Sequence, residues 1–287
     1  MKYISIIVFI FFISPVSDAQ DLYLNIGGGI MNYGGDLQEK NFTLNQSSGA
    51  FSLGLSYRLS DYFSVSSSYT FGVVHADDKL SNTSNAVRNL NFKSAISEGN
   101  LLLEAQLKNV PAFARFTPYL FGGLAVFHFN PYTYDTSGNK AFLQPLHTEG
   151  QGLVQYPDRK VYNLTQFAIP FGFGVRYALS DQVLISCEFG FRKLFTDYLD
   201  DVSTSYADTT ILYNTNGALS AALSFRGDEL KPPVNFRTGA RRGNPEHNDT
   251  YYTCLIKLSF SISSISGAGS SSFHRIQKQT GCPRKVL

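Results

Sequence analysis

Three side chains in or just after one predicted strand, Ser68, His75 and Asp77, have the types that a hydrolytic nucleophile site requires. In such a site an acidic residue orients a histidine, and the histidine removes the proton of a serine hydroxyl within hydrogen-bond reach. Serines are frequent throughout the surrounding segment, and no spacing distinguishes Ser68 from its neighbours. We therefore predict that the protein is not an enzyme. A lipid-modifying enzyme is the alternative.

A stretch of aspartates offers a second candidate site, for a calcium ion. Asp197, Asp200, Asp201 and Asp208 would supply the carboxylate oxygens that calcium prefers. The stretch lacks the glycine turn and the terminal glutamate of an EF-hand loop, so we interpret it as a solvated acidic loop. The glycine run 27–29 lies inside a predicted strand with no helix after it, which excludes a phosphate-binding loop. The sequence predicts no metal ion, cofactor or small-molecule substrate.

Charged side chains recur on the polar face of segments in which apolar and polar residues alternate. Strict alternation indicates a β-strand with one apolar and one polar face. In segments 51–59, 63–71 and 167–179 the apolar face carries many large aromatic side chains. A membrane β-barrel turns such a face toward lipid and its polar face toward the lumen.

Because an eight-stranded barrel has an interior that side chains can fill, inward charges of opposite sign are expected to pair across it. The residues predicted to form this interior charge network are Arg58, Glu104, Arg176, Glu188, Arg192 and Lys257. A selective conduction path along the same residues is the alternative.

Eight segments are long enough to cross a bilayer as tilted strands, which requires about 9–11 residues each. They are residues 21–34, 47–59, 62–75, 100–108, 116–129, 165–179, 183–195 and 251–263. In the fifth segment we expect the aromatic residues Tyr119, Phe121, Phe127 and Phe129 to face outward. Long connections are expected at about 35–46, 76–99, 130–164 and 196–250. Within the last of them, residues 215–225 have helical rather than alternating spacing.

The fold class predicted is all-β: an eight-stranded antiparallel up-and-down transmembrane β-barrel. Short periplasmic turns and long extracellular loops alternate in such a barrel, which places both termini in the periplasm. Residues 1–19 combine Lys2, a short apolar run and small residues before Gln20, which is typical of a signal peptide. The barrel domain is expected over residues 20–263 and a separate tail over 264–287. The predicted location is the outer membrane of a Gram-negative cell, with membrane lipid as one partner.

Net charge and cysteine content exclude other classes of protein. The formal net charge is +2, so no nucleic-acid partner is indicated. The three cysteines are too few, and odd in number, for a disulfide framework.

Three segments carry a resemblance to a known family. Residues 31–37 contain Tyr33-Gly-Gly-Asp36-Leu37, residues 242–252 lead into the last strand, and the tail closes in Gly281-Cys-Pro-Arg284. Together they resemble the PorG-type outer-membrane barrels of Bacteroidota, which are components of the type IX secretion system. The resemblance implies a non-enzymatic role beside a periplasmic ring, formed by a lipoprotein and its partner, in protein export and in some organisms gliding. It also implies that the translocation pore is a different and far larger barrel.

The tail is the predicted contact with that ring. Residues 264–287 contain no acidic side chain, so they form a basic arm that is able to order on an acidic surface. The candidate contact residues are Arg275, Lys278, Cys282, Arg284 and Lys285. A solvated tail without a partner is the alternative. Other functions left open by the sequence are a small channel or transporter and a surface adhesin that acts through the long loops.

Overall fold

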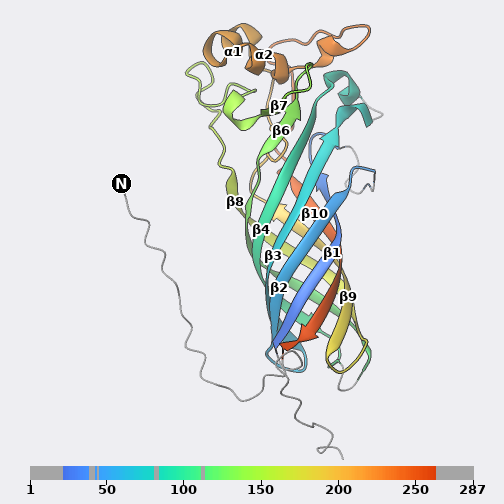
Figure 1. Cartoon of the computed structure of the whole chain (residues 1–287). Coiled ribbons are helices and arrows are strands. Elements are labelled where there is room, and N and C mark those ends of the chain that lie inside the picture. Colours follow the sequence, from blue (N-terminus) through green and yellow to red (C-terminus); the bar gives the residue numbers. More distant parts are fainter. Residues whose placement is uncertain (1–21, 39–42, 44, 81–83, 111–113, 263–287) are drawn as a thin grey trace, which may run out of the picture.

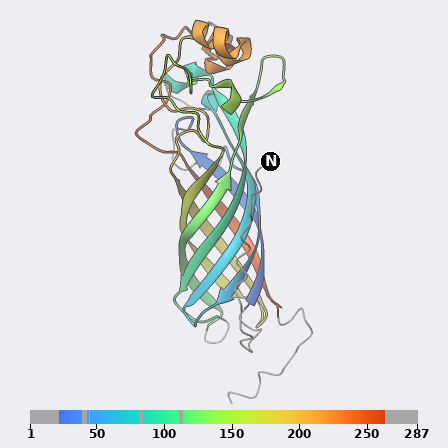
Figure 2. The same ribbon diagram turned by 90° about the vertical axis from the view of Figure 1, so that its left-hand side faces the viewer.

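Eight antiparallel strands of the computed structural model close into one barrel (Figure 1, Figure 2). The structure describes residues 22–38, 43, 45–80, 84–110 and 114–262. The barrel strands are β1 (Leu22–Gly34), β2 (Ser48–Arg58), β3 (Phe63–Asp77), β4 (Asn91–Gln106), β5 (Phe116–His128), β8 (Thr165–Ala178), β9 (Val183–Leu194) and β10 (Thr250–Ser261). Each strand pairs with the next one, and β1 pairs with β10, so the barrel sheet closes on itself. The predicted fold class is confirmed.

The fourth strand is much longer than predicted. β4 begins at Asn91 and pairs with β3 as far as Asp77, whereas the sequence predicted its start at residue 100. Its residues alternate between buried and exposed along the whole length. The outward positions of the added part carry Lys93, Ala95 and Ser97 rather than large apolar side chains. This weak apolar face is the reason that the sequence pattern did not reveal the extension.

The lumen-facing side of β5 was predicted wrongly. Tyr119, Phe121 and Phe127 are buried inside the barrel, and Phe129, just after the strand, is buried as well. The outward positions are held by smaller apolar residues such as Leu120 and Leu124. Large aromatic side chains serve the interior here because they fill it, and the Tyr119 hydroxyl also finds a polar partner there.

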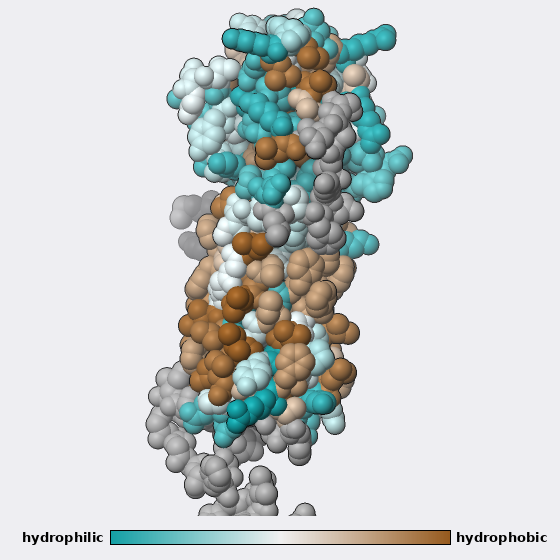
Figure 3. Space-filling model, turned by 90° about the vertical axis from the view of Figure 1, so that its right-hand side faces the viewer, coloured by the Kyte–Doolittle hydropathy of each residue, from teal (hydrophilic) through white to brown (hydrophobic). Residues whose placement is uncertain are grey.

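The outer wall of the barrel is apolar. Phe167, Phe171 and Phe173 of β8 are exposed on it, and Phe171 stacks on Phe191 of β9 at 5.7 Å between ring centroids. Figure 3 shows the apolar band on one face of the barrel, below a mainly hydrophilic region. Apolar surface of this extent is stable against lipid and costly in water. The architecture is therefore that of an outer-membrane β-barrel. Among the described residues no helix has the length and apolar character needed to span a bilayer.

The two ends of the barrel differ in size. At one end, here called the turn end, short links join β2 to β3 and β8 to β9. Tyr23 near the start of β1 pairs with Ser261 at the end of β10, so both chain ends leave the barrel at the turn end. At the opposite end the long connections form a cap, defined as the described residues of 35–47, 78–90, 129–164 and 195–249 (Figure 1).

The cap has its own secondary structure. The hairpin of β6 (Pro131–Tyr134) and β7 (Lys140–Phe142) continues the sheet beside β4. Two α-helices follow, α1 (Thr209–Asn216) and α2 (Ala218–Ser224), so the predicted helical segment 215–225 is confirmed. Asp208 caps α1 by accepting a hydrogen bond from the backbone N–H of Thr210 at 2.7 Å. The 3₁₀-helices are η2 (Asp78–Leu80), η3 (Ser84–Arg88), η4 (Gln144–Leu146) and η5 (Gly227–Glu229).

One hydrophobic core joins the barrel to the cap. Met31, Ile96 and Phe127 fill the lumen near the cap, and each is fully buried. Phe129 stacks on Phe127 at 5.5 Å and on Tyr162 of the cap at 6.1 Å. Because this core is continuous, the cap is held in a fixed position on the barrel.

Candidate functional site

Two ion pairs cross the half of the lumen that is nearer the turn end. Arg176 pairs with Glu104 at 2.6 Å, and Lys257 pairs with Glu188 at 2.6 Å. The Tyr119 hydroxyl donates to Glu188 at 2.8 Å, and its ring lies 4.5 Å from the Arg176 guanidinium. The space left between these side chains is a cavity of about 10 Å³. A cavity of this size holds at most about one water molecule, so side chains fill the lumen at this level.

A third ion pair lies closer to the cap. Arg192 binds Glu98 with two nitrogens, at 2.8 and 3.1 Å, and both residues are buried. The hydroxyl of Tyr251 and the amide of Asn100 donate to the same carboxylate at 2.6 and 2.7 Å. Sequence reasoning missed Glu98 because it lies in the unpredicted extension of β4. Glu98 lies two residues before Asn100 and therefore on the same face of the strand, and this spacing could have identified it.

Arg58 lies apart from the other predicted interior charges. Its guanidinium donates to the Tyr23 hydroxyl at 2.9 Å and to the Val110 carbonyl at 2.8 Å, near the turn end. The remaining predicted residues are brought together in oppositely charged pairs, with Glu98 as the added partner.

The three residues considered for a nucleophile site are not brought together. Ser68 is on the lumen side and donates to Asn100 at 2.8 Å. His75 is on the outer side of the same strand and bonds Ser48 at 2.9 Å. Asp77 accepts a hydrogen bond from the Lys79 backbone. Because Ser68 and His75 lie on opposite faces of β3, the histidine is not placed to act on that serine.

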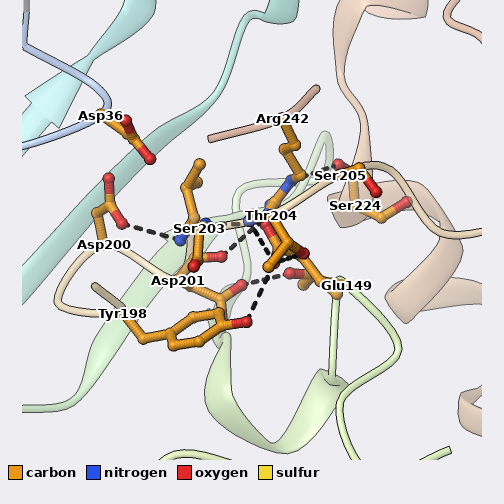
Figure 4. Close-up of polar contacts among 12 residues, drawn as sticks. Asp36, Glu149, Tyr198, Asp200, Asp201, Ser203, Thr204, Ser205, Ser224 and Arg242 are labelled. Atoms are coloured by element: carbon orange, nitrogen blue, oxygen red, sulfur yellow. Dashed lines mark hydrogen bonds and ion pairs between the residues drawn. The ribbon is translucent and has the colours of Figure 1, made fainter. Parts of the chain in front are cut away.

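Glu149 and Arg242 form the centre of the polar contacts in the cap (Figure 4). Their side chains pair at 3.0 Å and both are buried. Glu149 also accepts hydrogen bonds from the backbone N–H groups of Ser203 and Thr204, at 2.9 and 3.0 Å. Arg242 in turn donates to the backbone carbonyl of Asp201 at 2.6 Å. A single buried ion pair thus joins the connection 129–164 to two separate stretches of the connection 195–249.

The two internal segments that carry the family resemblance meet beside this pair. The Tyr33 hydroxyl lies 2.5 Å from Asp200 Oδ2 and 3.1 Å from Asp249 Oδ1. Asp36 accepts a hydrogen bond from the Asn244 backbone at 2.7 Å. Segments 31–37 and 242–252 therefore act together with the aspartate stretch that the sequence presented as a solvated loop. That interpretation is wrong for Asp197, Asp200 and Asp201, which are buried.

Gly35 is the tightest point of this contact. A Cβ atom there would lie 1.9 Å from Asp249 Oδ1 and 2.2 Å from the Tyr33 hydroxyl. We expect Gly35→Ala to destabilise the cap by about 1–3 kcal/mol, because side chains that are already packed must move. Limited proteolysis of the refolded barrel would measure this effect. Gly28→Ala is the matched control, since a Cβ there meets no atom within 4 Å. Equal protease resistance of the two variants would contradict the prediction.

Burial raises the pKa values of several aspartates in the cap. Burial raises the pKa of Asp197 to about 8, against a smaller lowering by Ser203. It also raises the pKa of Asp201 to about 6, although Arg242 opposes that shift. The pKa values of Asp200 and Asp249 are raised by burial and by their neighbouring carboxylates. Within the part of the chain that the structure describes, no three His, Cys, Asp or Glu side chains are arranged to hold a metal ion.

The pKa of Asp197 leads to a pH dependence. In the unfolded chain this carboxyl ionises near 3.8, whereas in the folded cap it keeps its proton to about 8. The cap therefore loses stability as pH rises between these two values. We expect Asp197→Asn to stabilise the cap at pH 8 by about 1–2 kcal/mol, less than the full shift implies because solvent screens the group. Thermal unfolding at pH 5 and pH 8 tests this. An unchanged pH slope in the variant would rule it out.

Several predicted features lie outside the described residues. They are the signal peptide 1–19, the tail 264–287 and the candidate contact residues Arg275, Lys278, Cys282, Arg284 and Lys285.

Solved structures with a similar fold are eight-stranded outer-membrane barrels. Neisserial surface protein A, from Neisseria, is 9% identical, with 84% of this chain and 96% of that chain covered and a TM-score of 0.41. Ail, the attachment invasion locus protein of Yersinia pestis, solved with the heparin analogue sucrose octasulfate, is 8% identical with a TM-score of 0.40, covering 84% and 97%. OprG of Pseudomonas aeruginosa is 12% identical with a TM-score of 0.39, covering 85% and 98%.

Sequence comparison is informative at the level of family. No curated protein sequence matches this chain. One family model, described as a domain of unknown function (DUF6089), matches residues 2–216. This match includes most of the barrel and well over half of the chain, so the protein belongs to the DUF6089 family.

Proposed function

We propose that the protein is a non-enzymatic outer-membrane component of the type IX secretion machinery, which anchors or organises a periplasmic ring complex for protein export. The observation that carries this proposal is the filled lumen. Three ion pairs and an aromatic core occupy the interior, which leaves no path for a transported protein. We infer that a barrel with no path for a transported protein acts through its surfaces and its chain ends.

The arrangement of the chain ends supports a partner at the turn end. Both ends leave the barrel there, so in the proposed orientation the basic tail enters the periplasm while the cap faces outward. The sequence resemblance supplies the identity of the partner, a ring of a lipoprotein and its associated protein. Segments 31–37 and 242–252, which carry the family resemblance, contact each other in the folded cap. This contact supports treating the two segments as one feature of the family.

Affinity purification from mildly crosslinked envelopes tests the proposal. The full chain is compared with a chain that stops after Ser263 and with a chain in which the tail residues Arg275, Lys278, Arg284 and Lys285 are replaced by glutamine. Replacing the three serines 270–272 by alanine is the control. We expect the ring proteins to accompany the full chain and the serine control, and to be lost from the other two. Absence of ring proteins from the full chain would overturn the proposal.

A second candidate function is a surface protein that binds through its cap, as an adhesin does. The observation that favours it is the size and order of the cap, whose loops share a buried core with the barrel. It predicts that changes in the cap abolish function while removal of the tail does not.

A further inference from the structure

The cap contains a cleft that neither the lumen nor the tail explains. It has a volume of about 450 Å³, within the range of about 300–1,000 Å³ that small-ligand sites occupy. It lies between η3 and the segment 225–243. Its lining includes Asp36, Tyr206, Phe225, Phe236 and Arg241.

Three aromatic rings form one wall of the cleft. Phe225 and Phe236 lie 4.3 Å apart between ring centroids, and Tyr206 lies 4.7 Å from Phe236. Tyr206 meets Phe225 edge to face at 5.5 Å. Mutual packing fixes these rings, so they present a rigid apolar surface to anything that enters.

The polar groups of the cleft are partly unsatisfied. The Tyr206 hydroxyl has no hydrogen-bond partner among the described residues, although the side chain is only 4% exposed. Arg241 uses its Nε to donate to the Gly243 carbonyl at 2.7 Å, and among the described residues its terminal nitrogens make no hydrogen bond, although its charge acts on Asp36. Asp36 uses Oδ2 for the Asn244 backbone, so its Oδ1 is available as an acceptor.

The other two arginines on the cleft are neutralised within the protein. Arg88 pairs with Asp78 at 2.7 Å, and Arg242 pairs with Glu149 at 3.0 Å. Arg241 and Asp36 then leave one positive and one negative group, so the cleft has no excess charge to attract a simple ion. It offers donors, acceptors and an apolar wall together.

We propose that this cleft binds a neutral saccharide. Sugar hydroxyls both donate and accept hydrogen bonds, which matches a guanidinium donor, a carboxylate acceptor and a phenol that does either. The apolar C–H face of a pyranose ring matches the aromatic wall, and the volume admits one or two rings. The site requires neither the secretion partner nor the tail.

Saturation-transfer NMR with the purified full chain in lipid nanodiscs tests the proposal. The probes are glucose, galactose, mannose and N-acetylglucosamine, with phenyl phosphate as the anionic comparison. We expect at least one sugar to bind, and to bind about three- to tenfold more weakly to Tyr206→Phe and to Arg241→Ala, because each loses hydrogen bonds. The matched controls are Tyr213→Phe and Arg237→Ala, exposed residues that do not line the cleft, and they should bind as the parent does.

Three outcomes would overturn the proposal. The first is no transfer to any of the four sugars. The second is transfer to phenyl phosphate alone, which would make the site one for organic anions. The third is equal binding by the cleft variants and their controls, which would place the sugar elsewhere on the protein.

Discussion

Replacing Arg192 by methionine is expected to destabilise the barrel by about 3–5 kcal/mol, because Glu98 would be left as a buried charge without its partner. Both residues are buried, and among the described residues the carboxylate would keep the Tyr251 hydroxyl and the Asn100 amide as donors. Urea-induced unfolding in lipid vesicles, followed by the gel-mobility shift of the folded barrel, measures the loss.

Two further variants make this result specific. Lys193→Met changes the neighbouring charge on the outer side of β9, outside the lumen, and is expected to have a small effect. Combining Arg192→Met with Glu98→Gln removes both charges and should recover a large part of the lost stability. A single variant as stable as the parent would show that this ion pair does not support the barrel.

Truncating Phe127 to alanine is expected to cost about 3–5 kcal/mol, because the side chain is fully buried and a cavity would remain. Phe127 contacts both Phe129 and Tyr251, so its loss loosens the junction of barrel and cap. The same unfolding experiment applies, with protease sensitivity of the cap as a second measurement.

Leu124→Ala is the matched control, since Leu124 is on the same strand but 68% exposed on the outer wall. It should cost clearly less, because lipid fills the space that the smaller side chain leaves. If Leu124→Ala were the more damaging change, the sequence-based assignment of Phe127 to the lipid face would be restored.

Alternation predicted the barrel well because it reports the feature that matters most for a membrane strand, which is its two different faces. Seven of the eight strands agree with the prediction within two residues at both ends for this reason. Alternation alone does not say which face meets lipid when both faces carry apolar residues. In β5 the prediction placed the larger residues on the lipid side. Their size instead favours Phe127 for filling the lumen, and the smaller Leu124 lies on the outer wall.

The cap was predictable only in part. A short helix was visible from local spacing at 215–225, where α2 forms, and Asp208 caps the preceding helix α1. Glu149 and Arg242 are far apart in the chain, and no local sequence pattern predicts that they form an ion pair. The aspartates near Asp200 look solvated in sequence because burial is decided by loops that arrive from elsewhere.

The pairing of β1 with β10 sets the order of events in assembly. Tyr23 and Ser261 become neighbours only after almost the whole barrel sequence has been made, so closure waits for the last strand. The carboxylate of Glu188 likewise waits for Lys257 of β10. Contacts this distant along the chain form slowly. The chain must therefore be kept unaggregated while its first strand lacks one neighbour, and the interior becomes electrically balanced only in the final step.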